Sequence, residues 1–111
     1  MNSENRTLNF IRRTDWQKIP AEAQRKSKLA LLDALGATIS GTLTPISLIT
    51  ATYAARTWKG DDATIILQGK RASVIGAAFA NAYTANGFDS DDGATYTRGH
   101  PGAQLIPTAL A

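Results

Sequence analysis

A regular spacing of large apolar residues constrains the fold more than any other feature of the sequence. Between Ala21 and Ser40 these residues recur at intervals of three and four, at Leu29, Leu32, Leu35 and Ile39. This period is typical of one face of an α-helix. Pro20 suits the first turn of such a helix because its φ is fixed, and Gly41 is a typical stop signal. We expect this face to lie in a hydrophobic core.

The same pattern restarts after a short break. Thr44 and Pro45 suit the N-cap and the first helical position, and the helix is expected to run toward Gly60. Its apolar face would carry Ile46, Ile49, Tyr53 and Trp58. Because only a few residues separate the two helices, we expect them to be antiparallel. Further helices are predicted at residues 7–13, at residues 74–86 after the N-cap Ser73, and from Pro101.

One segment departs from the helical pattern. The β-branched run Thr64-Ile65-Ile66, followed by the turn residues Gln68-Gly69-Lys70, predicts a short extended segment near residues 63–67. Since one strand cannot form a sheet, this segment should pair with a partner outside these residues or remain an extended connection. The predicted fold class is therefore all-α, with antiparallel helices and one short extended segment.

Composition narrows the class of protein. The chain has 111 residues, 43% hydrophobic and 19% charged, which suits one globular domain or a part of a larger one. It contains no cysteine, which excludes disulfides and thiolate zinc sites and suits a cytoplasmic location. From Ala34 to Ala55 no residue is charged, but hydroxyl side chains, Gly36, Gly41 and Pro45 interrupt this stretch, so we expect no membrane span.

The net charge of +3 comes from basic residues that are concentrated before residue 29. They are scattered among helix-forming residues, without an aromatic platform or a glycine motif that could hold bases. We therefore expect a solvated helical surface and no nucleic-acid partner.

The candidate chemistry lies in one segment, Phe88 to Ala103, which holds Asp89, Asp91, Asp92 and the only histidine, His100. An EF-hand reading fails because Ala94 stands where glycine is required and His100 where a bidentate glutamate is required. No transition-metal site is expected from one histidine and flexible carboxylates. Two interpretations stay open on spacing alone: a solvated polar loop, or carboxylates and a histidine that transfer protons.

Six segments in order give the sequence a resemblance to a known family. They are "W..IP" (16–20), "LALLDALGATISG" (29–41), "ATIILQGKRAS" (63–73), "AAFANA" (77–82), "DSDDG" (89–93) and "GHPGAQLIPTALA" (99–111). Together they resemble the N-terminal part of the MmgE/PrpD family, which includes 2-methylcitrate dehydratases and cis-aconitate decarboxylases. The resemblance runs from about Leu8 to Ala111.

The resemblance implies a helical domain built from both ends of a longer chain, a second α+β domain, a homodimer, and neither metal nor organic cofactor. It implies that Asp89 and His100 are catalytic and that Asp91 and Asp92 face the substrate. Two positions depart from the family: Asn86 stands where many members have histidine, and Gly93 where they have threonine. Thr95 is therefore expected to supply the missing hydroxyl to the substrate, with Thr97 as the alternative.

Residues 1–111 are thus expected to be a truncated N-terminal portion of a lyase or isomerase-type enzyme that acts on a di- or tricarboxylate. Such a substrate needs cationic partners, and close to the acidic segment the sequence offers only Arg98. The portion is therefore expected to be inactive alone. A second hypothesis is a small helical module that associates with itself or with a partner and has no catalytic activity.

Overall fold

Helices dominate the computed structural model, which describes residues 3–96 and 98–111. The described α-helices are α1 (Ser3–Arg13), α2 (Ala21–Gly41), α3 (Pro45–Thr57), α4 (Val74–Asn86) and α5 (Pro101–Leu110), with a 3-10 turn η1 (Trp16–Lys18). The predicted all-α class is confirmed, and so is each predicted helix. The bounds differ at some ends: α1 begins at Ser3 rather than near Thr7, and α3 ends at Thr57 rather than Gly60.

The predicted extended segment exists, but the expectation about its partner is wrong. β1 (Ala63–Ile65) pairs antiparallel with β2 (Lys70–Ala72) in the same chain. The turn between them places Leu67 and Gly69 in the left-handed region, at φ 56° and 61°. β2 carries no β-branched residue, so no strand signal is present at these positions. The contact of Arg71 with the Thr64 hydroxyl and the burial of Ala72 help to hold this short hairpin.

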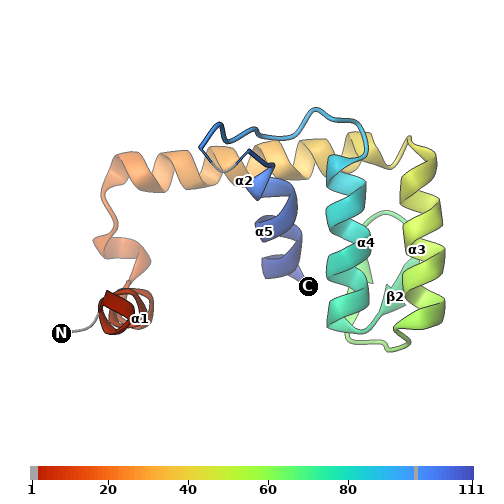
Figure 1. Cartoon of the computed structure of the whole chain (residues 1–111), viewed down its shortest axis with the longest axis horizontal. Coiled ribbons are helices and arrows are strands. Elements are labelled where there is room, and N and C mark those ends of the chain that lie inside the picture. Colours follow the sequence, from red (N-terminus) through yellow and green to blue (C-terminus); the bar gives the residue numbers. More distant parts are fainter. Residues whose placement is uncertain (1–2, 97) are drawn as a thin grey trace.

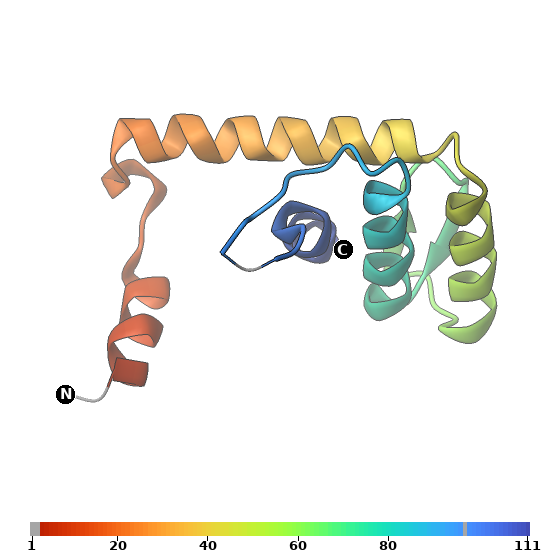
Figure 2. The same cartoon turned by 45° about the horizontal axis from the view of Figure 1, so that its top comes forward.

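The helices are arranged around a bend between α2 and α3. These two helices are bent by 93° at their break, so the expectation that they are antiparallel is wrong. Antiparallel packing is instead found between α3 and α4 (Figure 1), whereas α5 packs on α4 at an oblique angle, since Figure 2 shows α5 nearly end-on and α4 from the side. Figure 2 shows α2 passing over α4 and α5 at one end of these helices. The close contacts of α4 with α2, α3 and α5 make it the central helix.

The core consists almost entirely of small side chains. Its cluster is formed by Ala51, Ala54, Ala63, Ile65, Ala72, Ala77 and Ala80. The alanine-rich helix α4 packs closely, because Ala77 and Ala80 are fully buried against α3 and the hairpin. Asn81 ties the hairpin to α4: its side chain accepts from the Ile66 N–H at 2.9 Å and donates to the Thr64 carbonyl at 3.1 Å.

The large apolar residues of α2 and α3 do not form this core, contrary to the prediction. Leu29, Leu32, Ile39, Ile49 and Tyr53 are exposed, and only Leu35, Ile46 and Trp58 are partly buried. On α2 the buried residues are instead small ones: Ala34, Ala37, Thr38 and Gly41. Gly41 explains the choice of face, because a Cβ there would lie only 2.8 Å from the Thr84 carbonyl carbon of α4. The helices approach too closely for leucine at this crossing.

The N-terminal segment extends away from the rest. Figure 1 shows α1 and the first turns of α2 reaching beyond the other helices, and the residues from Asn5 to Asp33 are exposed or partly exposed throughout. Among the described residues, no single helix is long and apolar enough to cross a membrane. α2 and α3 taken together do meet that test of length and composition, despite their 93° bend.

Candidate functional site

The loop between α4 and α5 carries the predicted site residues. α4 ends at Asn86, and two residues after the Gly87 cap Asp89 adopts a left-handed φ of 53°. Aspartate tolerates this conformation better than most residues, and it often marks a functional position. An antiparallel bridge pairs Ala94 with Gly99 within this loop. His100 then occupies the N-cap position of α5, directly before Pro101.

Asp91 brings the two ends of this loop together. Its carboxylate accepts from the Asn86 side-chain amide, with both N···O distances at 3.2 Å. Its Oδ2 also lies 3.3 Å from Nδ1 of His100, and the Asp91 side chain is only 1% exposed. A carboxylate this well buried needs such partners, because burial without them is costly. Asp91 therefore links the end of α4 to the start of α5.

The contact between Asp91 and His100 is close but not aligned. Nδ1 of His100 is buried, and despite the 3.3 Å approach it makes no hydrogen bond of regular geometry within the described residues. With the proton on Nδ1, facing Asp91, Nε2 would be the free acceptor, the arrangement by which a carboxylate orients a histidine base.

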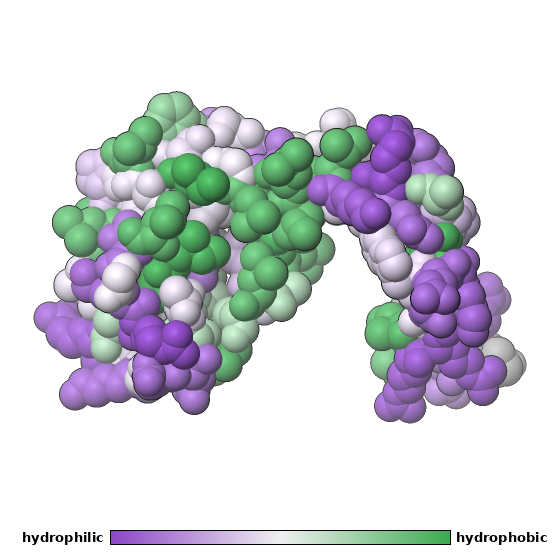
Figure 3. All heavy atoms as spheres, turned by 180° about the vertical axis from the view of Figure 1, so that it is seen from behind, coloured by the Kyte–Doolittle hydropathy of each residue, from purple (hydrophilic) through white to green (hydrophobic). Residues whose placement is uncertain are grey.

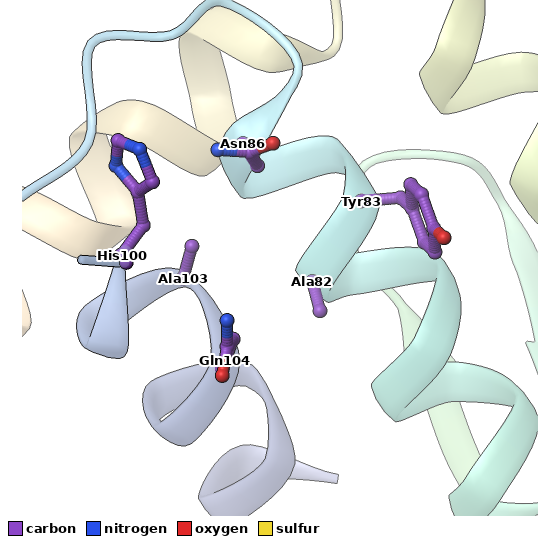
Figure 4. A pocket seen from close by; sticks show the side chains of 7 residues that line it. Ala82, Tyr83, Asn86, His100, Ala103 and Gln104 are labelled. Atoms are coloured by element: carbon purple, nitrogen blue, oxygen red, sulfur yellow. The ribbon is translucent and has the colours of Figure 1, made fainter. Parts of the chain in front are cut away.

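An open pocket lies beside His100, between α4 and α5 (Figure 4). Its volume is about 350 Å³, within the range of small-molecule sites. The lining residues are Ala82, Tyr83, Asn86, Gly99, His100, Ala103 and Gln104. Figure 4 shows the His100 ring and the Asn86 amide at one end of the gap between the two helices. The lining residues include neither lysine nor arginine, so the described part of the pocket offers an anion no full positive charge.

The structure gathers some of the predicted residues and separates others. Asp89, Asp91 and His100 each offer one polar atom within 4.8 Å of the others. Asp92 points elsewhere: its Oδ1 accepts from the Gly102 N–H of α5 at 2.8 Å. Thr95 is exposed in the turn between Ala94 and Gly99 and does not line the pocket, while Thr97 lies outside the described residues. The substrate contacts predicted for Asp91, Asp92 and Thr95 stay predictions.

The polar groups of Asp89, Asp91 and His100 are also a candidate set of metal ligands. Two carboxylates and one imidazole form a ligand set that a divalent transition metal accepts. In this structure, however, the Asp91 carboxylate already contacts Asn86 and His100. A metal would have to displace at least one of these contacts, so the geometry fits an orienting carboxylate better than a metal ligand.

Several pocket residues were not singled out from the sequence. Tyr83 lies in none of the six segments, Gln104 lies in the segment 99–111 but was given no role, and Asn86 was noticed only as a departure from the family pattern. One signal was available for Tyr83 and Asn86, because residues three apart in the predicted helix share a face. No sequence signal connects Asp92 with Gly102, since ten residues of loop and helix start separate them.

Comparison with known proteins supports the resemblance suggested by the ordered motifs. The family model described as MmgE/PrpD N-terminal domain matches residues 5–111. No curated protein and no solved structure gives a significant match. The matched region includes α2, α3, α4 and α5 and the loop that carries Asp89, Asp91, Asp92 and His100. The chain therefore belongs to the MmgE/PrpD family.

Proposed function

We propose that this chain is the N-terminal part of a cofactor-independent lyase or isomerase-type enzyme, acting on a di- or tricarboxylate in the cytoplasm. The observation that carries the proposal is the meeting of Asp89, Asp91 and His100 within 4.8 Å, at a pocket of about 350 Å³. Family membership supports the reaction class, and the contacts of Asp91 with Asn86 and His100 support the choice of residues. A solvated polar loop would not need a buried Asp91 beside the histidine.

The proposed chemistry is a dehydration of the 2-methylcitrate type. One group removes a proton from the carbon next to a carboxylate, and a second group gives a proton to the departing hydroxyl, which leaves as water. His100 and Asp89 take these two roles, because the imidazole borders the pocket and the Asp89 carboxyl is exposed nearby. Asp91 contacts the opposite ring nitrogen and holds the ring in place.

Charge leads us to propose that residues 1–111 do not catalyse this reaction alone. Three carboxylates stand near the pocket, and the nearest described cation in the sequence is the exposed Arg98. A tricarboxylate would be repelled unless other cationic groups neutralise it. We propose that those groups come from outside these residues, in the complete enzyme or its homodimer.

The test begins with the protein isolated from its native source and identified by its N-terminal peptides. Its dehydration of 2-methylcitrate and decarboxylation of cis-aconitate would be measured for the wild type and for Asp89→Asn and His100→Gln. We expect each variant to lose about 10²-fold or more in rate, the usual contribution of a positioned proton-transfer group. The control is Asp33→Asn, an exposed aspartate on α2.

Full activity in both variants would refute the proposed roles. Enzyme-like turnover by isolated residues 1–111 would refute the proposed need for further residues. Inactivity of the native protein toward both substrates, with activity on another polycarboxylate, would redirect the substrate assignment.

A second candidate function rests on exposed apolar surface. Large hydrophobic side chains gather over much of the helical part of the molecule (Figure 3), and Leu32 is 66% and Ile49 61% exposed. Surfaces of this kind favour association. We propose a second copy of the chain as the partner. Light scattering should then give twice the monomer mass, and Leu32→Lys with Ile49→Lys should restore the monomer; a wild-type monomer at high concentration would refute it.

A further inference from the structure

We propose that Asp92 and Gly102 form a clamp that positions His100, and that Asp92 acts through this clamp rather than by touching the substrate. The clamp is the hydrogen bond from the Gly102 N–H to Asp92 Oδ1, 2.8 Å long, between residues ten apart in the chain. It joins the acidic loop to the first turn of α5.

The first turn of α5 needs a cap from outside the helix. His100 occupies the N-cap position but its side chain makes no capping hydrogen bond, and Pro101 has no N–H to donate. Gly102 therefore carries the first helical N–H that needs an acceptor, and a helix start leaves such groups without partners inside the helix. The Asp92 carboxylate supplies the acceptor, and its negative charge also suits the positive end of the helix dipole.

The identity of residue 102 fits this contact. Glycine normally weakens a helix relative to alanine, and Gly102 does not have the positive φ that would require it. A Cβ at this position would lie 2.9 Å from Cγ of Asp92 and closer still to its Oδ1. An alanine here would require the Asp92 carboxylate to shift from its present position, and we expect this shift to weaken the hydrogen bond. Close approach to Asp92 is therefore the requirement that glycine meets.

The clamp connects to the site through the neighbouring residue. Asp91 contacts His100 and Asn86, while Asp92 holds Gly102, two residues after His100. Two successive carboxylates thus fix the loop to the end of α4 and to the start of α5. The position of the His100 ring at the pocket follows from these two attachments. The role of the clamp in catalysis rests on the proposed function. The clamp itself rests only on the hydrogen bond between Gly102 and Asp92.

The test uses nuclear magnetic resonance on the 111-residue chain, in which His100 is the only histidine and its ring signals are unambiguous. Two quantities are measured: the protection of the amide of residue 102 against hydrogen exchange, relative to its intrinsic rate, and the chemical shifts of the His100 ring. The variants are Asp92→Ala, Gly102→Ala, their double variant, and Asp92→Asn. The matched control is Gly36→Ala, since a Cβ at that helical glycine meets nothing within 4 Å.

We expect Asp92→Ala and Gly102→Ala each to lower the protection at residue 102 about tenfold, the size of a lost charge-assisted hydrogen bond. Both should move the His100 ring signals to the same new positions. The double variant should add nothing further, because either change alone already breaks the clamp. Asp92→Asn keeps an acceptor oxygen and should restore both quantities to near the wild-type values, and Gly36→Ala should leave them unchanged.

Three results would overturn the clamp. They are a wild-type Gly102 amide without protection, a Gly102→Ala variant with unchanged protection and ring signals, or effects that add in the double variant. None of these measurements requires substrate. An enzyme that keeps its activity in Asp89→Asn would refute the proposed function and leave the clamp standing, so the two proposals can fail separately.

Discussion

Two regions of this chain have similar helical sequences but opposite packing. We call residues 3–33 the arm and residues 34–111 the body. The described side chains of the arm include no buried residue, although it carries Phe10, which is 69% exposed, and Leu32, which is 66% exposed. The body has a buried cluster, yet apart from Ile65 that cluster is made of alanines. Large apolar side chains therefore did not decide which region packs.

The difference shows that helix formation and burial depend on different information. A helix forms from local backbone hydrogen bonds and local propensity, so a periodic sequence predicts it in both regions. Burial needs a second surface, and in the body small residues allow the helices to approach closely. In the arm no such surface is present among the described residues. The apolar faces of the arm and of α3 are consequently available to a partner.

The largest effect should come from filling the closest helix crossing of the body. Gly41→Ala places a Cβ against the Thr84 carbonyl, and backbone atoms cannot swing aside. We expect it to lower the free energy of unfolding by about 3 kcal/mol, the upper range for overpacking. Gly36→Ala in the same helix should instead raise it by about 0.5 to 1 kcal/mol, because the space there is open. Urea unfolding of both variants measures the contrast, and equal effects would contradict it.

An effect of intermediate size is expected when two side-chain amides are removed in turn. Each amide makes hydrogen bonds with two backbone groups, and we expect the two losses of unfolding free energy to differ. Asn81 in the body holds Ile66 and Thr64 and is 2% exposed, whereas Gln24 in the arm donates to the carbonyls of Trp16 and Ile19. Asn81→Ala should lower the free energy of unfolding by about 2 kcal/mol, since it leaves two partly buried backbone groups without their partner. Gln24→Ala should cost about 0.5 kcal/mol, because water replaces the bonds. A larger loss for Gln24→Ala in urea unfolding would show that the arm is more tightly packed than described.

The smallest effect should come from truncating an exposed leucine of the arm. Leu32→Ala removes a side chain that has little contact within this chain, so unfolding should change by less than about 0.5 kcal/mol. A core leucine would cost about 2 to 5 kcal/mol on the same change. A loss of that size, measured by urea unfolding at several protein concentrations, would show that Leu32 is covered. If the loss of unfolding free energy grew with protein concentration, a second copy of the chain would be what buries Leu32.

Particular elements show how far sequence reasoning reached. The Ser73 cap was predicted and is present, because its hydroxyl accepts from the Gly76 N–H within the same turn. The strand β2 was missed, because Lys70-Arg71-Ala72 becomes a strand only through its pairing with β1. The prediction that α2 and α3 are antiparallel was wrong for a similar reason. A short connection limits the distance between two helices but does not set the angle between them.

The candidate site divides in the same way. Asp89, Asp91 and His100 were grouped from the sequence, and the fold does bring their polar atoms together. The contact of Asp92 with Gly102 and the lining of the pocket by Tyr83 and Gln104 were not predicted. These features depend on how α5 packs on α4, and no local pattern encodes that packing.

The sequence by itself determined the helices, their approximate limits, the family and the chemistry-bearing loop, because these follow from neighbouring residues and ordered motifs. Only the tertiary structure decided that small residues form the core, that α2 turns sharply into α3, and that Asp91 lies buried against His100. The physical reason is that burial and close approach are properties of two surfaces at once. Each surface is formed by a separate stretch of sequence, and whether two surfaces fit together is decided only when the chain is folded.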